Sequence, residues 1–517
     1  MREAVIVEAV RTPLGRRNGK LKGFHPVLLG SMVLQELIKR AGIDPALVED
    51  VVWGTVMQTG EQSVNIGRNA WLTAGFPVET PATTVDRQCG SSQQAIHFAA
   101  NLIQSGIADI TIAGGVESMT RVPMGSTVLQ GPGVPFPPEL LEQYDLVPQG
   151  ISAELIARKY GIDRKAMDEF SVRSHHLAAA ATDKGYLRSQ IMPIEISNGT
   201  TQVMERDEGI RADATYEKVS QLQPAFNPEH SITAANSSQI TDGAAAVLLM
   251  SKEKAQELGL KPRARIIAQK VVGCDPILML EGPIPGTRAV LKQAGLDLKD
   301  IDLFEVNEAF ASVPLAWLKE TGADPEKLNV NGGAIAIGHP LGASGARLMN
   351  HLLHELERRD LRYGLETDVL RRRDRHRHDH RPQGRLRLPV ATTSKTYDSF
   401  ESVRPYRIWP GVLAHAVRGE SVSFALVDLE PNVAVAEHSH PNEQAGFIIQ
   451  GTFSFTIGGE TRELKPGDTY VIPGGVRHSA VAGPEGTVAL DIFSPPREDW
   501  EALERTEPRK ASWPPPS

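Results

Sequence analysis

Residues 1 to about 365 alternate short β-branched runs with alanine- and leucine-rich stretches in which apolar positions recur at helical spacing. The short runs predict strands and the longer stretches predict helices. The predicted strands lie at 5–7, 51–53, 110–113 and 245–249, and the predicted helices at 28–41, 91–105, 152–159, 165–183 and 288–294. Strands that alternate with helices predict an α/β layered fold.

This part also contains a faint internal repeat. Segment 39–44 is echoed by segment 292–297, and each closes a predicted helix before a strand. Cys89 follows the first segment at nearly the same distance as His339 follows the second, and each opens a run of small residues. The repeat predicts a duplicated domain with one active site between its halves.

The pattern changes twice beyond residue 365. Residues 368–402 are highly charged and show no apolar periodicity, which predicts a linker. From 403 to 500, short strand-like runs separated by Gly, Pro and Asp turns predict a small all-β barrel. A proline-rich tail follows at 501–517.

Composition narrows the class of protein. The chain has 517 residues, a formal net charge of −8, 41% apolar and 23% charged residues, which excludes a wholly disordered chain, collagen and a coiled coil. Mild acidity gives no reason to expect a nucleic-acid partner, and no apolar run approaches the ~18 residues of a membrane span. Met1 leads almost directly into a strand, so we expect no signal peptide and a cytoplasmic location. Two cysteines, Cys89 and Cys274, exclude a disulfide framework and a cysteine-based zinc site.

Cys89 is the first candidate for chemistry. Run 84–95 passes from an extended segment into a helix, and Cys89 lies at that turn. Unpaired N–H groups and the positive end of the helix dipole would lower the pKa of the thiol and stabilise an oxyanion on an attached acyl group. A buried structural cysteine is the more common alternative for a lone cysteine.

Two further motifs decide between these alternatives. They are Asn307-Glu308-Ala309-Phe310-Ala311 and the glycine-rich run 332–347, which contains His339. With the Cys89 run they resemble the thiolase family over residues 1 to about 367. The resemblance implies duplicated, layered α/β/α halves, at 1–263 with a loop subdomain at about 119–245, and at 264–367 in truncated form. It also implies acyl-CoA and coenzyme A as substrates, and a homodimer or homotetramer.

The resemblance assigns roles to individual residues. Cys89 is expected to take the acyl group from a 3-ketoacyl thioester, and His339 to activate it. Asn307 is expected to hold a water that, with His339, binds the thioester oxygen of the enolate. Ser238, in loop 236–244, is expected to contact the pantetheine arm of coenzyme A. Cys274 matches no reactive position and is expected to be a core thiol.

Segments near the site favour a degradative thiolase. Many short-chain biosynthetic thiolases carry a His-Met dipeptide before a Gly-x-x-Ala-Glu helix, whereas this chain has Pro148-Gln149-Gly150 there. With residues 85–88, this favours thiolytic cleavage of 3-ketoacyl-CoA to acetyl-CoA and a shortened acyl-CoA, as in fatty acid β-oxidation. A biosynthetic acetyl-CoA acetyltransferase and an inactive thiolase scaffold stay open as alternatives.

The resemblance breaks at residue 368. Thiolases end with a second cysteine followed by glycines; that cysteine moves the proton of the reacting carbon, and a glycine N–H completes the oxyanion hole. Here no cysteine follows Cys274, and Asp368 opens the charged run. Codons can be chosen for 368–383 that, read one base later, encode Met-Cys-Cys-Gly-Gly-Gly-Thr-Gly-Thr-Gly, so we infer a frameshift. Loss of an acid/base group and an oxyanion donor predicts turnover at least ~10³-fold below that of an intact relative.

The charge run at 371–381 has three interpretations. A solvated linker, produced by the frameshift, is favoured because charge runs are usually solvated. A patch for nucleic acid or anionic lipid and a His-rich metal tract are the alternatives. None of them can replace a buried terminal strand, since burial of an unpaired arginine costs several kcal/mol.

The β domain carries a candidate metal site. His438 and His440 are two residues apart on one predicted strand and therefore point the same way, and His478 follows a Pro-Gly turn on a partner strand. An exposed pair on a strand is the common alternative for two such histidines.

The segments 437–444 and 467–478, with Gly451, resemble the cupin family over about residues 406–494. The resemblance implies a divalent transition metal of unknown identity, since imidazole and oxygen donors suit such ions. Its implied ligands are His438, His440, Gln444 and His478. A metal-free module that senses a sugar or another effector is the alternative.

Overall fold

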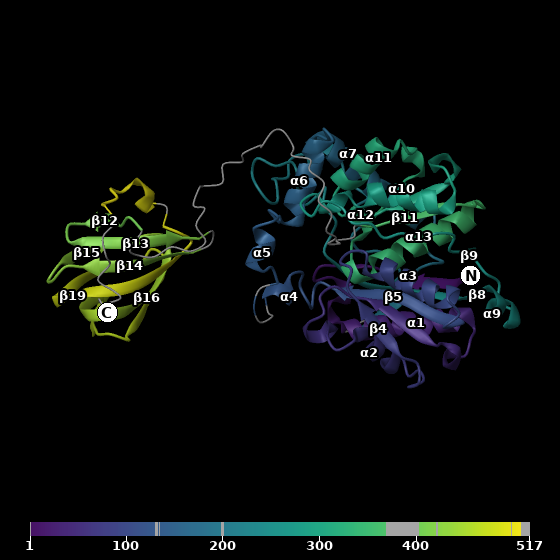
Figure 1. Cartoon of the computed structure of the whole chain (residues 1–517), viewed down its shortest axis with the longest axis horizontal. Helices are drawn as coiled ribbons and strands as arrows, with labels where there is room; N and C mark the ends of the chain where they lie inside the picture. Colours follow the sequence, from purple (N-terminus) through teal and green to yellow (C-terminus); the bar gives the residue numbers. More distant parts are fainter. Residues whose placement is uncertain are drawn as a thin grey trace. The chain divides into compact units, whose positions relative to one another are not determined.

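The computed structural model describes residues 2–129, 133, 135–197, 201–368, 403–419, 422–497 and 499–507. The chain divides into two compact units, Met1–His378 and Asp379–Ser517, each described by itself (Figure 1). The predicted charged linker beyond Asp368 and residues 508–517 of the predicted tail lie outside the described residues. No helix in the described part is long and apolar enough to cross a membrane.

The first unit is built on a seven-stranded mixed sheet. Its strands are β1 (Ala4–Arg11), β2 (Gly15–Arg16), β3 (Asp50–Gly54), β4 (Ala82–Val85), β5 (Ile110–Ser118), β8 (Thr241–Ser251) and β9 (Ala264–Arg265). They follow the order β4-β3-β5-β8-β1-β9, and β2 also pairs with β8. β3 is parallel to β4 and β5, whereas β8 is antiparallel to β5 and β1. All residues of β5 and β8 are buried, as expected for strands that are covered on both faces.

Alternate residues of β1 face different helix layers. The covering helices are α1 (Pro26–Ala41), α2 (Ile66–Thr73), α3 (Ser91–Gln104) and α13 (Ser344–Arg359). Val5 packs in one apolar cluster with α1 and α2, whereas Ile6 packs in another with α3 and α13. Side chains that alternate between two helix layers are typical of a strand that lies between those layers. The predicted α/β layered fold is confirmed, and the predicted strands lie within β1, β3, β5 and β8.

The repeat found in the sequence ends two helices in the same way. Gly42 follows α1 and Gly295 follows α10 (Pro283–Ala294), each with a φ of +67°. Each glycine N–H donates to a carbonyl one helical turn earlier. Glycine adopts this left-handed conformation without the steric cost of a side chain. β3 follows the first glycine, and β10 (Leu303–Val306) follows the second.

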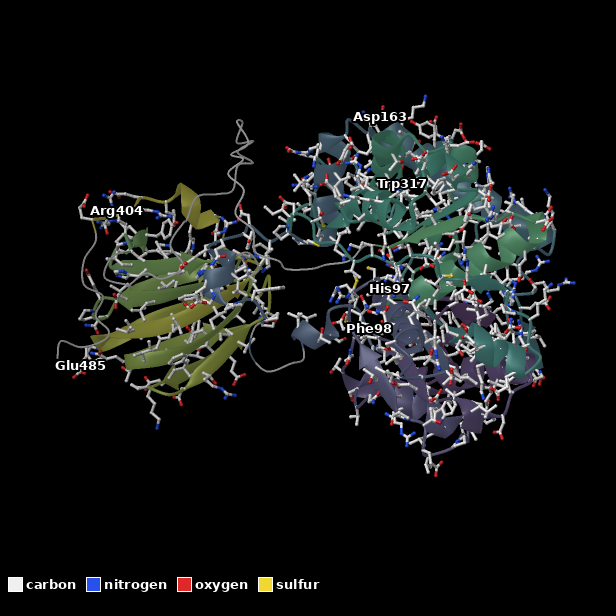
Figure 2. All side chains as sticks on the ribbon, turned by 45° about the vertical axis from the view of Figure 1, so that its right-hand side comes forward. His97, Phe98, Asp163, Trp317, Arg404 and Glu485 are labelled. Atoms are coloured by element: carbon white, nitrogen blue, oxygen red, sulfur yellow. The ribbon has the colours of Figure 1, made fainter. Side chains whose placement is uncertain are left out.

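The C-terminal half has a smaller sheet. Within the described residues it consists of β10 and β11 (Gly364–Thr367), which pair in parallel. α11 (Ser312–Thr321) supplies Trp317 to its core, and Figure 2 labels this side chain. A cavity of about 490 Å³ is lined both by β11 and by the segment 263–268. The short helices α9 (Lys252–Glu257) and α12 (Ala334–Ile337) complete this unit.

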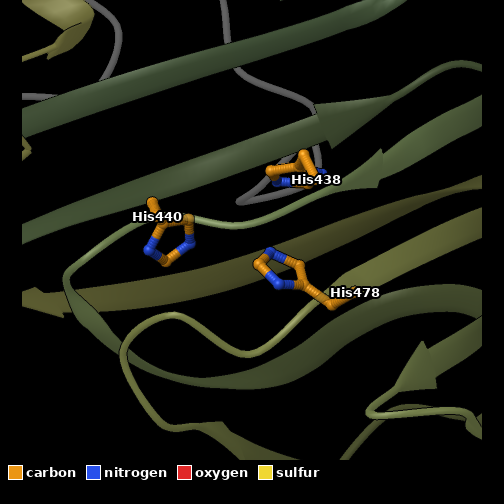
Figure 3. Close-up of side chains that lie close together, drawn as sticks. All are labelled: His438, His440 and His478. Atoms are coloured by element: carbon orange, nitrogen blue, oxygen red, sulfur yellow. The ribbon is translucent and has the colours of Figure 1, made fainter.

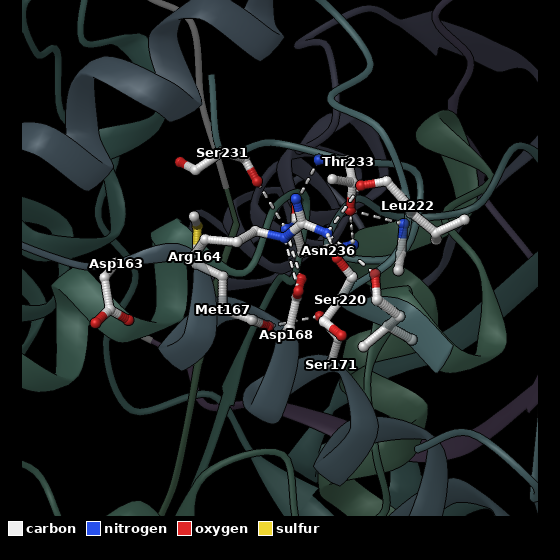
Figure 4. Close-up of polar contacts among 12 residues, drawn as sticks. Asp163, Arg164, Met167, Asp168, Ser171, Ser220, Leu222, Ser231, Thr233 and Asn236 are labelled. Atoms are coloured by element: carbon white, nitrogen blue, oxygen red, sulfur yellow. Dashed lines mark hydrogen bonds and ion pairs between the residues drawn. The ribbon is translucent and has the colours of Figure 1, made fainter. Parts of the chain in front are cut away.

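The chain leaves the large sheet between β5 and β8. This excursion contains α4 (Ser126–Leu129), α5 (Pro138–Leu141), α6 (Gln149–Lys159), α7 (Arg164–Asp183), α8 (Tyr216–Val219) and the hairpin of β6 (Ile194–Ser197) and β7 (Thr201–Met204). Asp168 on α7 accepts hydrogen bonds from Arg164 Nε (2.6 Å) and Asn236 Nδ2 (3.0 Å) (Figure 4). Because Asn236 precedes β8, these bonds fix the segment that holds Ser238.

The second unit is all-β, as predicted. Its strands are β12 (Tyr406–Trp409), β13 (Val412–Arg418), β14 (Ser423–Leu429), β15 (Ala434–His438), β16 (Glu443–Ile457), β17 (Glu460–Leu464), β18 (Thr469–Ile472) and β19 (His478–Ser494). They follow the order β12-β13-β14-β19-β16-β17, with β15 on β19 and β18 on β16. The pairings among these described strands form an open path rather than a closed barrel. Their apolar residues enclose a separate core that includes Phe453, Phe455 and Phe493.

Candidate active site and candidate metal centre

Cys89 lies in the turn between β4 and α3, as the sequence predicts. Gln88 before it has a left-handed backbone, with a φ of +50°, and Gly90 after it is the N-cap of α3. The Ser91 hydroxyl closes the turn, since it donates to the Gln88 carbonyl (2.5 Å) and accepts from the Arg87 N–H (2.9 Å). The turn holds Cys89 in the interior, where it is 2% exposed.

The surroundings of Cys89 favour the protonated thiol. Burial raises the pKa of the thiol well above its ordinary value, and the carboxylates of Asp368 and Glu117 raise it further. Hydrogen bonds from the backbone N–H of Cys89 and from the Gln149 side chain act in the opposite direction without compensating. The prediction of a lowered pKa is therefore wrong for this site, because burial outweighs the helix N-terminus. A thiolate here requires a nearby base.

His339 is held as a neutral imidazole. Its Nδ1 lies 2.6 Å from the Ser344 hydroxyl, which itself donates to the Pro340 carbonyl (3.0 Å). The hydroxyl proton is thus committed, so Nδ1 carries the ring proton and Nε2 is left as an acceptor. Burial, with the positive charge of Arg347, lowers the pKa of His339 to about 3. A neutral ring that is unprotonated at Nε2 can accept a proton.

Asn307 lies between His339 and Asp368. Its Nδ2 is 3.3 Å from His339 Nε2 and donates to Asp368 Oδ1 at 2.8 Å. The sheet register explains this arrangement: β10 and β11 pair Val306 with Thr367, so the next residues, Asn307 and Asp368, emerge side by side. Both side chains are buried.

Ser238 lies in a loop that is tied to the Asn307 motif. Its N–H donates to the Ala309 carbonyl (2.9 Å), and the adjacent Gln239 carbonyl accepts from the His339 N–H (3.2 Å). The Gln239 side-chain amide also donates to the Ala336 carbonyl (2.9 Å). The structure therefore links the segments that carry Ser238, Asn307 and His339 through backbone contacts. Ile240 and Leu341, from two of these segments, belong to the apolar cluster around Cys89.

In the β unit, three histidines form a cluster. His438 ends β15, His478 begins β19, the two are register partners, and His440 follows closely in the chain. One ligand atom of each lies within 4.8 Å of the others (Figure 3). Each Nδ1 lies 2.9–3.0 Å from a backbone carbonyl, which fixes the ring proton on Nδ1. The Nε2 atoms of His438 and His478 are left as acceptors, the form in which imidazole binds a metal, whereas His440 Nε2 lies near another acceptor, the Gln444 side-chain oxygen.

The fourth predicted ligand lies beside this cluster. Gln444 Oε1 is 3.0 Å from His440 Nε2. A cavity of about 60 Å³ is lined by Gln444 together with His438, His478 and a pair that the sequence reasoning missed, Tyr470 and Asp491. The Tyr470 hydroxyl donates to Asp491 Oδ1 (2.5 Å). Three imidazole Nε2 atoms and an amide oxygen form a ligand set that fits a divalent transition metal.

Comparison with known proteins identifies the family that each unit matches. Residues 4–253 match the thiolase N-terminal domain, residues 260–369 the thiolase C-terminal domain and residues 425–493 the cupin domain. Over 375 residues, the chain is 48% identical to the steroid 3-ketoacyl-CoA thiolase FadA6 of Mycobacterium tuberculosis, covering 71% of this chain and 91% of that protein. The chain belongs to the thiolase family.

Two further similarities support the thiolase assignment. The chain is 45% identical over 377 residues to a 3-ketoacyl-CoA thiolase of Klebsiella pneumoniae, covering 71% of this chain and 96% of that protein. It resembles the crystal structure of the Bacillus anthracis acetyl-CoA acetyltransferase with a TM-score of 0.67 and 41% identity, over 72% of this chain and 96% of that one. The predicted thiolase-type acyltransferase, followed by a cupin domain, is confirmed.

Two buried carboxylates of this thiolase were missed by the sequence reasoning. Asp368 was assigned to the charged linker, although it follows β11 as Asn307 follows the parallel β10. Glu117, at the end of β5, accepts hydrogen bonds from the Val56 and Gly342 N–H groups (both 2.9 Å). Glu117 therefore connects the N-terminal half to the segment that follows His339. A polar residue at the end of a buried strand was the available signal in both cases.

Proposed function

We propose that the thiolase unit cleaves 3-ketoacyl-CoA by thiolysis through an acyl-enzyme on Cys89. The observation that carries this proposal is the neutral His339 ring, whose unprotonated Nε2 lies beside Asn307. Leu341, two residues after His339, packs in the apolar cluster that contains Cys89. Two of the relatives described above are named 3-ketoacyl-CoA thiolases, which supports this direction.

The proposed reaction has two steps. In the first, His339 accepts the thiol proton, and Cys89 Sγ attacks the 3-keto carbon. The bond between C2 and C3 breaks, and acetyl-CoA leaves once its C2 carbon has received a proton. In the second, the thiol of coenzyme A attacks the acyl-enzyme, releasing the shortened acyl-CoA and Cys89. Ser238 is proposed to contact the pantetheine arm in both steps.

Intact-mass spectrometry tests this proposal directly. After mixing with 3-ketoacyl-CoA in the absence of free coenzyme A, the chain should gain the mass of the shortened acyl group on the peptide that contains Cys89. A chain that stays unmodified would support the inactive-scaffold alternative.

A biosynthetic direction is the second candidate, favoured by the similarity to the acetyl-CoA acetyltransferase structure. Its signature would be condensation of two acetyl-CoA molecules and no preference for longer chains. Rates with acetoacetyl-CoA and with longer 3-ketoacyl-CoA substrates separate the two candidates.

We also propose that the thiolase unit assembles as a homodimer or homotetramer in the cytoplasm. The proposal rests on the family resemblance, and light scattering of the purified chain measures the mass. The impaired turnover, the frameshift and the predicted domain boundaries stay predictions.

For the cupin unit we propose one divalent transition metal held by the Nε2 atoms of His438, His440 and His478, with Gln444 as the fourth ligand. The three Nδ1–carbonyl hydrogen bonds support this, because they orient each ring and fix its tautomer before a metal arrives. Such an ion would supply a Lewis acid beside the small cavity.

Removal of one imidazole should release the metal. His440→Ala or His478→Ala is expected to weaken metal binding by at least the roughly 10–100-fold that loss of a ligand's outer partner costs. Elemental analysis of the dialysed full-length chain measures the effect. His415→Gln is the matched control, because His415 is buried in the same unit and lies 3.6 Å from Asp428 rather than in the cluster. Equal metal content in all four proteins would contradict the metal site and favour the metal-free alternative.

A further inference from the structure

A buried carboxylate stands beside the proposed thiolase chemistry. Asp368 is 3% exposed, and its Oδ1 accepts from Asn307 Nδ2 at 2.8 Å. The same Asn307 nitrogen is 3.3 Å from His339 Nε2. A single side-chain amide therefore bridges the carboxylate and the imidazole.

The backbone fixes this position independently of the side chains. β11 is parallel to β10, and the Asn307 N–H donates to the Thr367 carbonyl (3.1 Å), which extends the ladder by one residue. Asp368 follows directly, at the carboxyl ends of both strands. Parallel strands present the residues that follow them at one edge of the sheet, where ligand sites of α/β proteins form.

The charge of Asp368 also affects the pKa of the reacting sulfur. Its carboxylate is among the groups that raise the pKa of the Cys89 thiol, and Arg347 is among the cations that face it. Glu366, two residues earlier, is another carboxylate nearby, and burial raises the pKa of Glu366 well above its usual range. Asp368, and not Glu366, is the one bonded to Asn307.

We propose that Asp368 is a catalytic acid and base of this chain and carries the proton of the reacting carbon. This inference rests on the proposed thiolysis and supplies the group that the missing second cysteine would provide. In the cleavage step, Cys89 Sγ bonds to C3 and the C2–C3 bond breaks. The electron pair of the broken bond stays on C2, which takes the proton from the Asp368 carboxyl. In the second step the Asp368 carboxylate accepts the thiol proton of coenzyme A, and the sulfur of coenzyme A displaces Cys89 from the acyl group. The leaving Cys89 sulfur takes back the proton that His339 accepted in the first step. Each turnover returns Asp368 to its protonated state.

The reverse of the first proton transfer gives a specific test. With acetyl-CoA in D₂O, the full-length chain should exchange the methyl protons of the acetyl group for deuterium, as seen by NMR. Asp368→Asn should lose this exchange by about 10²–10⁴-fold, the contribution of a positioned acid or base. Glu366→Gln is the matched control and should keep the exchange, because it removes a buried carboxylate from the same strand without touching Asn307.

A second readout separates this role from a structural one. Where the Asp368 carboxylate is ionised, removal of its charge should lower the pKa of the Cys89 thiol, so Asp368→Asn should react faster with iodoacetamide while it exchanges more slowly. In Asp368→Gly, added formate should restore part of the exchange by entering the space of the carboxylate. Because Cys89 is only 2% exposed, loss of the fold would also speed alkylation, so the recovery with formate is the change that a variant without its fold would not show.

Each result has a definite meaning. If Asp368→Asn keeps the exchange, the role of Asp368 is overturned and the proposed function stands. The same holds if the unmodified chain shows no exchange although Cys89 is acylated. An unmodified chain that exchanges methyl protons but never acylates Cys89 overturns the proposed function instead. Failure of formate to restore exchange in a folded Asp368→Gly chain also counts against the carboxylate.

Discussion

Cys89→Ala is expected to abolish the acyl-enzyme and all residual transfer. In the proposed reaction the sulfur forms the covalent bond to the acyl group. Its removal therefore prevents the reaction instead of slowing one step. Loss of a member of a nucleophile–base unit lowers turnover by roughly 10⁴–10⁶-fold in a well-studied protease. Consumption of 3-ketoacyl-CoA in the presence of coenzyme A measures the rate, and intact mass measures the acyl-enzyme.

Cys274→Ala is the matched control, since it removes the other thiol of the chain. Cys274 Sγ donates to the Met279 carbonyl (3.4 Å), and burial raises the pKa of this thiol to about 11. Its alanine variant should keep both the acyl-enzyme and the rate. Equal losses in the two variants, or an acyl group found on Cys274, would contradict the assignment of Cys89.

Local sequence patterns predicted the strands and helix ends that depend on the residues within them. The apolar runs at 110–113 and 245–249 became the fully buried strands β5 and β8, because a strand covered on both faces needs continuous apolar character. Gly42 and Gly295 end helices in both halves, because a left-handed residue is required there. The prediction that His438 and His440 share a strand is wrong, because β15 ends at His438. Both nevertheless lie near His478, and their role as ligands stays a prediction.

Properties that depend on distant parts of the chain could not be predicted in this way. The turn that holds Cys89 was expected to lower the pKa of the thiol, but burial among segments remote in sequence reverses the sign. Asp368 lies in a run that looks like a solvated linker, and only the register of β10 and β11 brings it to Asn307. The contact between Tyr470 and Asp491 likewise joins β18 to β19, two strands that share no local pattern.

The sheets of the two halves differ beside their parallel pairs of strands. In the N-terminal half, β3 and β5 are parallel neighbours, and β8 continues the sheet on the other side of β5. In the C-terminal half, β10 and β11 form the same parallel pair, but within the described residues no strand continues the sheet beyond β11. The cavity of about 490 Å³ borders β11 there and is lined by apolar side chains such as Ile266 and Leu291. An unpaired strand edge favours aggregation.

A restored C-terminus should change both activity and stability. The variant would keep residues 1–367 and continue with Met-Cys-Cys-Gly-Gly-Gly-Thr-Gly-Thr-Gly-Thr-Thr-Ile-Asp-Arg, the product of removing one base at codon 368. A strand of this sequence can pair with β11 as β8 pairs with β5, which would fill the cavity and cover the edge. The first glycines also offer the N–H that completes the oxyanion hole, and one such donor is worth about 10²–10³ in rate.

We expect turnover of 3-ketoacyl-CoA by this variant to exceed that of the present chain by about 10²–10³-fold, with less aggregation on heating. This gain in turnover is smaller than it would be if the present chain lacked both the acid/base group and the oxyanion donor, because Asp368 already supplies a proton in the present chain. The control carries the same added residues with both cysteines replaced by serine. It should recover the stability and little of the activity, since the strand is present without the thiol that moves the proton. If the present chain already turns over as fast as the restored variant, the missing terminus has no functional cost, and Asp368 with the remaining donors is sufficient for the whole reaction.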